Sequence, residues 1–313
     1  MARRRNRGRS VNGIFLLNKP LDLTSNQALQ RVKNLFNANK AGHTGALDPL
    51  ATGVLPICLG EATKFSQFLL DSDKHYRSTF TLGIATETGD CDGNSISQTD
   101  SSGLTRQQIE TAIDEFRGTI QQVPSMYSAL KVNGQPLYKL ARQGIEVERE
   151  ARDITVFNYE ILDFRPGQRA ELDVELHVSK GTYVRSLAED LGQVLGCGAH
   201  VSALHRHIAG PFTDAQTMRL SDLEVLRDTC QPADLDYLLK PMDIAVADRM
   251  AVELTDIVAQ YFQMGQEVIS TQAFRNGQEG DIVRVFREGG AFLGVATVTE
   301  EGKLAPKRLV VET

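Results

Sequence analysis

The stretch that decides how this chain is assigned is AGHTGALDPLATGVLPICLGEATK, residues 41–64, which holds one acid, Asp48, directly before Pro49. The stretch is too rich in glycine to form one regular element. Gly42 and Gly45 permit the close approach of a ligand, and Pro49 fixes the direction of the chain after the carboxylate. Because the flanking residues are apolar, we expect Asp48 to lie at a dry wall, where a carboxylate needs a cation or a chemical task. The alternative is an ordinary turn or capping carboxylate.

Arg185 is the candidate cation for this carboxylate. The segment SKGTYVRSLAEDLGQVLG, residues 179–196, predicts a helix that begins near Thr182. Arg185 then lies in the first turn, where the helix dipole disfavours positive charge, so a partner such as Asp48 is expected. The alternative is a side chain that extends to solvent. No second carboxylate is visibly paired with Asp48, which weakens a two-acid glycosidase. The sequence contains no P-loop and no GxGxxG motif.

The composition is that of a globular protein large enough for two domains, with 313 residues, 41% hydrophobic and 24% charged. The net charge of −6 is unevenly distributed, because residues 1–77 hold 12 Lys and Arg against five Asp and Glu. One basic surface is sufficient to bind phosphates, although chance clustering with a solubilising tail is the alternative. We find no apolar run of membrane-spanning length and no secretion signal, and therefore expect a cytoplasmic protein. The four cysteines have no zinc-binding spacing, so we expect reduced thiols and no metal site.

Local patterns predict the regular elements. Capping boxes begin helices at Thr24–Gln27 and at Thr105–Gln108. Strands are expected at residues 14–17, 78–84, 154–162 and 170–178, with shorter strands at 281–286, 291–298 and 307–312. The last three are separated by Gly-rich turns, which predicts a small β-rich domain appended from about residue 250.

Three segments differ from this regular pattern. Residues 1–10 hold five arginines and little that is apolar, and we expect a basic flexible tail. Residues 124–152 mix Pro, Gly, two Tyr and many Lys and Arg, which indicates an excursion from the core, a flap or an extended hairpin. The loop TETGDCDG, residues 86–93, lacks the twelve-residue calcium pattern, and we expect a structural turn.

Taken together, the motifs resemble those of one family, the bacterial tRNA pseudouridine synthases B that form pseudouridine 55 in the T arm. The resemblance covers nearly the whole chain and is loosest at residues 213–280. Besides the stretch around Asp48, it is found in LLNKPLDLTSNQALQRVK (16–33), DSDKHYR (71–77), QVPSMYSALKVNGQPLYKLARQGIEVEREAR (122–152), SKGTYVRSLAEDLG (179–192), GCGAHVSALHR (196–206) and PKRLVV (306–311).

This resemblance implies a site. Asp48 is the essential catalytic carboxylate, Arg185 pairs with it and orients it, and Tyr76 stacks on the target base and serves the final deprotonation at C5. The implied substrate-binding residues are His43, which contacts the RNA where the base has left its stack, Tyr183 and Leu204, which line the uracil pocket, and Lys19 and Lys64.

The two lysines have different expected roles. Lys19, with Pro20, should support the Asp48 loop rather than react, whereas Lys64 and the Arg-rich tail should meet phosphates. A uridine in a folded T loop must be flipped out, at a cost of a few kcal/mol, and aromatic stacking offsets about 1–3 kcal/mol of this. The implied reaction breaks the N-glycosidic bond and rejoins uracil through C5, with no metal or organic cofactor. Whether Asp48 adds to the ribose, adds to the base or removes a ribose proton stays open.

The fold that the resemblance implies is α+β, with a mixed, largely antiparallel central sheet and flanking helices. It places the flexible tail at 1–10, a catalytic domain at 11–247 with its flap at 124–152, and a PUA-like RNA-binding domain at 248–313. The flap should close on the T loop. The expected partner is tRNA, bound by a monomer without a guide RNA, an obligatory protein partner or a membrane.

Two departures from the family pattern are notable. Where the family has Leu-Arg-Arg-Thr, this chain has Leu204, His205, Arg206 and His207, and the two histidines could make RNA binding pH-dependent near about pH 6.5. Residues 249–313 hold seven Lys and Arg against nine Asp and Glu, so we expect this domain to add little tRNA affinity. Rival functions are an RNA chaperone, a guide-RNA-dependent synthase and an RNA N-glycosidase, although we find no water-activating base for the last.

Overall fold

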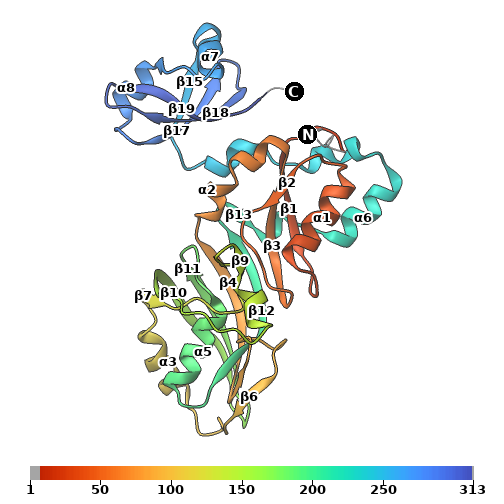
Figure 1. Ribbon diagram of the computed structural model, residues 1–313, viewed down its shortest axis with the longest axis vertical. Coiled ribbons are helices and arrows are strands. Elements are labelled where there is room, and N and C mark those ends of the chain that lie inside the picture. The colour runs from red at the N-terminus through yellow and green to blue at the C-terminus, as the bar shows by residue number, and fades with distance from the viewer. Residues whose placement is uncertain (1–7, 312–313) are drawn as a thin grey trace.

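A ten-stranded mixed sheet organises the larger domain of the computed structural model, which describes residues 8–311 (Figure 1). Its strands are β1 (Gly13–Lys19), β2 (Ala41–His43), β3 (Ala51–Leu59), β4 (Lys74–Leu82), β7 (Gly118–Gln122), β10 (Arg152–Arg165), β11 (Glu171–Val178), β12 (Ala199–Ala209), β13 (Phe212–Thr213) and β14 (Met218–Arg219). They follow the order β14-β1-β3-β12-β4-β11-β10-β7, with β13 beside β12 and β2 beside β3. Within the described part of this sheet, only β1–β14 and β3–β12 pair in parallel. The expected α+β fold with a mixed, largely antiparallel sheet is confirmed.

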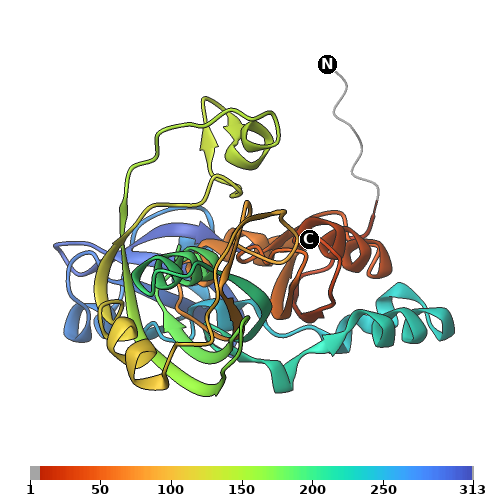
Figure 2. The same ribbon diagram turned by 90° about the horizontal axis from the view of Figure 1, so that it is seen from below.

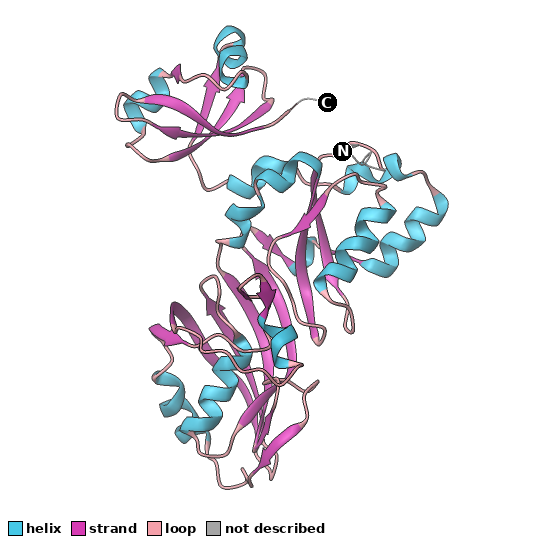
Figure 3. Cartoon of the chain, in the orientation of Figure 1, coloured by secondary structure: helices cyan, strands magenta, loops and turns pink. Residues whose placement is uncertain are grey.

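Helices flank this sheet and connect its strands (Figure 3). They are α1 (Ser25–Leu35), α2 (Ser66–Leu70), α3 (Arg106–Asp114), α5 (Val184–Val194) and α6 (Leu220–Thr229), with short 3-10 helices η1 (Gly60–Lys64), η2 (Asp214–Gln216), η3 (Pro232–Leu238) and η4 (Met242–Val246). α1 and α6 pack together at the β1 end of the sheet, whereas α3 and α5 pack together near β10 and β12. Both predicted capping boxes are present, at Thr24 with Gln27 and at Thr105 with Gln108. No helix within residues 8–311 is long and apolar enough to cross a membrane.

The glycine-rich stretch, for which the sequence predicts no single regular element, contains the nine-residue strand β3. This strand pairs in parallel with β12, with Leu204 opposite Ala51 and Arg206 opposite Gly53. Gly53 has a φ of +104°, and a Cβ added there would lie 2.2 Å from the carbonyl oxygen of Arg206. Only glycine permits this approach. The pairing, here called the β3–β12 seam, joins the two halves of the sheet.

The smaller domain is built on a second sheet of five strands in the order β15-β17-β18-β19-β16. Its elements are β15 (Ala251–Leu254), α7 (Asp256–Gln263), β16 (Val268–Ile269), α8 (Thr271–Asn276), β17 (Ile282–Arg287), β18 (Phe292–Val298) and β19 (Lys303–Leu309). The β-rich character agrees with the sequence-based prediction, whereas α7 and α8 are not predicted. The domain packs on the larger one through Phe65 and Phe292, whose ring centroids are 5.2 Å apart.

The segment at residues 124–152 stands away from the sheet, as the expected excursion requires (Figure 2). It contains a two-stranded hairpin, β8 (Lys131–Val132) and β9 (Gln135–Pro136), followed by the short helix α4 (Leu137–Ala141). We keep the name flap for residues 124–152.

The expected flexible tail at residues 1–10 lies outside the described residues except for its last three. There Arg9 donates to the carbonyl oxygens of Phe36 (2.9 Å) and Pro232 (2.9 Å) and pairs with Asp236. These contacts hold the side chain of Arg9 against the end of α1 and η3, and the flexibility expected for residues 1–10 stays a prediction.

Candidate active site

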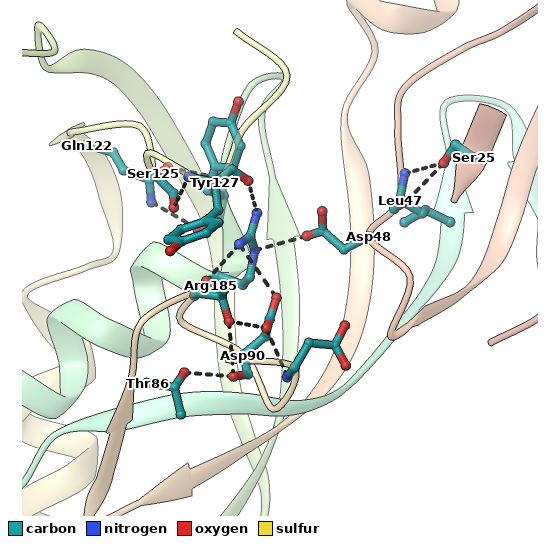
Figure 4. A network of polar contacts seen from close by, with 12 residues as sticks. Ser25, Leu47, Asp48, Thr86, Asp90, Gln122, Ser125, Tyr127 and Arg185 are labelled. Atoms are coloured by element: carbon teal, nitrogen blue, oxygen red, sulfur yellow. Dashed lines mark hydrogen bonds and ion pairs between the residues drawn. The ribbon is translucent and has the colours of Figure 1, made fainter. Parts of the chain in front are cut away.

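Asp48 lies in the loop between β2 and β3, and buried polar groups hold this loop in place. Ser25 Oγ donates to the carbonyl oxygen of Leu47 (3.0 Å) and accepts from the N–H of the same residue (2.7 Å) (Figure 4). Lys19 is fully buried, and its Nζ lies 3.4 Å from the carbonyl oxygen of Pro49, to which it donates. The residues on both sides of the carboxylate are therefore bonded to neighbouring elements.

Buried Arg206, the third residue of the LHRH segment, adds a third support. Its Nε donates to the carbonyl oxygen of Val54 (2.8 Å), and its Nη2 donates to that of Gly45 (3.2 Å).

Burial lowers the pKa of Lys19 to about 8, although Asp48 nearby raises it. These contacts agree with the predicted supporting role of Lys19. They do not agree with substrate binding by Lys19, because its ammonium is enclosed and already bonded to carbonyl oxygens.

The carboxylate of Asp48 faces Arg185, as the helix-dipole argument predicts. Nε of Arg185 lies 3.0 Å from Oδ2 of Asp48. The arginine side chain is 5% exposed, whereas that of Asp48 is 38% exposed. Within residues 8–311, Oδ1 of Asp48 has no hydrogen-bond partner. Only one of the two carboxylate oxygens is thus held within this part of the chain.

Asp90 is a second carboxylate on the same guanidinium, and the sequence prediction missed it. Its Oδ2 lies 3.5 Å from Nη1 of Arg185, and its side chain is 6% exposed. Nη1 also donates to the carbonyl oxygen of Thr88 (2.7 Å). Both residues lie in the loop between β5 (Ile84–Thr86) and β6 (Ser95–Gln98). This loop is therefore more than the structural turn that the sequence predicts, because it contributes a buried charge to Arg185.

The flap contacts the same arginine from the opposite side (Figure 4). Nη2 of Arg185 donates to the carbonyl oxygen of Tyr127, at 2.8 Å. Each of the three guanidinium nitrogens thus has a partner, and the partners come from the Asp48 loop, the β5–β6 loop and the flap. A planar, rigid donor group is suited to such simultaneous contacts.

The surroundings of Asp48 raise the pKa of its carboxyl group. Enclosure by protein is the largest cause, Arg185 lowers the pKa, and Asp90 raises it again. A carboxylate with a raised pKa binds a proton more tightly and is a stronger base than an exposed aspartate.

The structure places four other predicted residues on different elements of the larger domain. Tyr76 on β4 and Leu204 on β12 are 8% and 7% exposed, and they share one apolar cluster with Leu47. Tyr183 is the residue that precedes α5. His43 ends β2, and within residues 8–311 its buried Nδ1 has no hydrogen-bond partner. Burial, reinforced by a nearby guanidinium, lowers the pKa of His43, so its ring is neutral at pH 7.

Lys64 is not placed as the sequence predicts. It pairs with Glu61 and donates to the carbonyl oxygen of Leu309 (2.8 Å). Glu61 in turn accepts from the N–H of Val311 (2.9 Å). These contacts fasten the last strand of the smaller domain to η1, and they occupy the ammonium group that was expected to meet a phosphate.

The two histidines of the LHRH segment face away from the site. Successive side chains of a strand point to opposite faces, so His205 and His207 lie on the other side of β12 from Leu204. His207 Nε2 lies 3.1 Å from a carboxylate oxygen of Glu175, and burial lowers the pKa of this histidine. A lowered pKa is the opposite of what a cationic RNA contact near about pH 6.5 requires.

Comparisons with known proteins match the whole chain. Family models described as "TruB family pseudouridylate synthase (N terminal domain)", "tRNA pseudouridylate synthase B C-terminal domain" and "Pseudouridine synthase II TruB, C-terminal" match residues 33–184, 185–247 and 251–310. The tRNA pseudouridine synthase B of Saccharophagus degradans is 56% identical and that of Yersinia enterocolitica 53%, each over 100% of this chain and over 100% and 94% of their own lengths. A solved structure titled "Crystal Structure of a Cbf5-Nop10-Gar1 Complex" is 26% identical, with a TM-score of 0.69 and coverage of 96% of this chain and 84% of the other.

Proposed function

The chain belongs to the TruB family of pseudouridylate synthases, and on this premise we propose that it converts uridine 55 in the T arm of tRNA to pseudouridine. Enzymes of this family isomerise a uridine in place. In the proposed reaction the N-glycosidic bond breaks, the uracil turns, and C5 bonds to the ribose. The proton released from C5 is the measurable sign that the reaction has occurred.

The observation that supports this function best is the state of the Asp48 carboxylate. Arg185 holds its Oδ2 at 3.0 Å, and Oδ1 is unbonded within the described residues. We propose that Oδ1 is the reacting atom, either as a nucleophile on the ribose or base or as the base that removes a ribose proton. The raised pKa of Asp48 favours each of these roles, because the ionised carboxylate is then reactive.

The residues around Asp48 supply a binding site for an extruded base. Tyr76 would stack on the uracil and accept the C5 proton, and Tyr183 and Leu204 would line the pocket. His43 would fill the position that the flipped base leaves in the RNA. Aromatic stacking offsets about 1–3 kcal/mol of the cost of extruding the base.

We further propose that the enzyme acts in the cytoplasm as a monomer, without a guide RNA or a protein partner. In support, relatives at 56% and 53% identity over the full chain are named tRNA pseudouridine synthase B, whereas the Cbf5-containing complex is only 26% identical. The proposal includes the two domains expected from the sequence, a catalytic domain at residues 11–247 and a PUA-like RNA-binding domain at residues 248–313.

The decisive experiment is tritium release from a tRNA transcript labelled at C5 of uridine. Wild type should release tritium with or without EDTA, and Asp48→Asn should release none while still binding tRNA. A transcript with cytidine in place of uridine 55 tests the position. As a control, Asp100→Asn makes the same substitution at an exposed carboxylate and should not change the rate.

Three other outcomes of this experiment would each support a different function or role. Binding without release by wild type favours an RNA chaperone over an enzyme. Equal release by wild type and Asp48→Asn assigns the carboxylate to structure alone. Release of free uracil in place of tritium identifies an N-glycosidase.

A further inference from the structure

Gln122 is a buried polar residue at the root of the flap, and the proposed reaction makes no use of it. It is the last residue of β7, two positions before the flap begins, and it is 2% exposed. In the β7–β10 ladder it lies opposite Arg152, where the chain returns from the flap. Gln122 therefore lies at the departing end of this segment, opposite its returning end.

The amide of Gln122 makes two hydrogen bonds to the backbone of one residue, Tyr183. Its Oε1 accepts from the N–H of Tyr183 (2.8 Å), and its Nε2 donates to the carbonyl oxygen of Tyr183 (3.1 Å). Tyr183 immediately precedes α5 and has no side-chain cap of its own. The amide thus pairs the N–H of Tyr183, which would be costly to leave unpaired, and adds a second bond to a carbonyl oxygen that also accepts from the N–H of Leu187 (3.2 Å).

The position of Arg185 depends on this start. Arg185 is the second residue of α5 and follows Tyr183, to which Gln122 bonds, by two residues. Its guanidinium donates to Tyr127 at the base of the flap and pairs with Asp48. Gln122, Tyr183, Arg185 and Tyr127 therefore form a closed ring of covalent and hydrogen-bonded links.

We propose that Gln122 is a positioning residue, which holds the start of α5, and through it Arg185, at the correct distance from Asp48 when the flap moves onto RNA. This inference rests on the proposed function, because it assigns the reaction to the Asp48–Arg185 pair. Gln122 does not touch the reacting atoms. Its loss should slow the chemical step and leave tRNA affinity nearly unchanged, because the buried amide itself is not exposed to RNA.

The test compares Gln122→Met, which keeps the length of the side chain and removes both bonds, with Gln121→Met. Gln121 is the adjacent residue of the same strand, is exposed, and bonds to Asp153 instead. With enzyme in excess over labelled tRNA, the single-turnover rate of Gln122→Met should fall about 10- to 100-fold, the scale expected for a displacement of about 1 Å. The Kd for tRNA should stay within about twofold, and Gln121→Met should match wild type in both.

A double-mutant cycle shows whether Gln122 acts through Arg185. If it does, Gln122→Met should cause little further loss of rate in an Arg185→Lys background, because residues that act as a unit are not additive. Full additivity, or a wild-type rate for Gln122→Met with an unchanged circular dichroism spectrum, overturns the proposal.

Gln122→Glu decides the question if Gln122→Met does not fold. A protonated carboxyl can accept from the N–H and donate to the carbonyl oxygen of Tyr183, as the amide does, whereas an ionised carboxylate cannot donate. Relative to wild type, the rate of this variant should be highest at low pH and should fall as the pH rises. A ratio that does not change with pH overturns the proposal. If wild type itself releases no tritium, the proposed function has failed and not this inference alone.

Discussion

Replacing Arg185 with lysine tests the central contact of the site, because it keeps the charge and removes the planar donor group. The guanidinium bonds to Asp48, to the carbonyl oxygen of Thr88 at 2.7 Å and to that of Tyr127 at 2.8 Å. These three partners surround it. A lysine ammonium is a single point of charge on a flexible stem, so it can pair with Asp48 or bond to a carbonyl oxygen, but it cannot reach all three partners.

The expected loss follows from the bonds that are broken. A hydrogen bond from a charged donor contributes about 1.5–3 kcal/mol, and Arg185→Lys loses at least one while Asp48 becomes less firmly placed. A loss of about 3 kcal/mol at the transition state corresponds to about a 100-fold slower reaction, since about 1.4 kcal/mol is tenfold. Arg185→Met also leaves Asp48 and Asp90 without their shared cation. Breaking a buried pair in this way costs about 3–5 kcal/mol of folding stability, so this variant should also have a lower Tm, and its rate should fall at least as far as that of Arg185→Lys.

The assay is single-turnover tritium release with enzyme in excess, alongside filter binding of the same tRNA. The rate should fall and the Kd should stay within about threefold, because the buried guanidinium is not a phosphate contact. Arg77→Lys is the matched control, since the side chain of Arg77, on β4, is 62% exposed and lies 3.8 Å from a carboxylate oxygen of Glu175. A folded Arg185→Lys enzyme with a wild-type rate would refute the reasoning, because the multiple contacts of the guanidinium would then be dispensable.

Three more predictions concern charged side chains, two near Arg185 and one at the contact between the domains. Asp90→Asn removes a charge that raises the pKa of Asp48. In a plot of reaction rate against pH, the fall in rate at low pH, where Asp48 gains a proton, should therefore move to lower pH. A fall at the same pH as in wild type would contradict this coupling. Burial raises the pKa of Glu189 from 4.5 to about 7, so the folded state holds this proton more tightly than the unfolded chain. The stabilising contribution of Glu189 is complete below about pH 4.5 and is lost as the pH rises to about 7. Glu189→Gln should therefore flatten the plot of Tm against pH in that window. Plots for wild type and variant that run parallel would contradict this prediction. Lys64→Met removes the bond to Leu309, which should speed proteolysis between the two domains and leave the salt dependence of tRNA binding unchanged. A slope of log affinity against log salt concentration that is reduced by about one would instead indicate a phosphate contact.

The parts of this fold that the sequence predicts are those that depend on nearby residues. The two capping boxes are decided within three residues, and both helices begin where the pattern places them. The need of Arg185 for a carboxylate follows from its place in the first helical turn, which is again a local property. Its pairing with Asp48 was therefore predictable once a lone acid was found at a dry wall.

The parts that the sequence does not predict depend on tertiary pairing. Gly53 weakens the local strand pattern, yet the parallel contact with Arg206 requires a glycine there. Asp90 reaches Arg185 only after the β5–β6 loop has folded against α5. Lys64 was expected to be free for phosphate because its partner, a backbone carbonyl of Leu309, leaves no signal in a side-chain pattern.

The β3–β12 seam also determines when the protein becomes active as it folds. Asp48 precedes β3, whereas Arg185 belongs to the helix before β12, so the two arrive from distant parts of the chain. Parallel pairing over a long sequence separation is slow to form, because the entropy of closing the loop is lost before the contacts stabilise it. During refolding, helix signals should therefore recover before tritium-release activity does. We therefore expect a nascent chain that has formed its helices but not this seam to lack RNA-modifying activity.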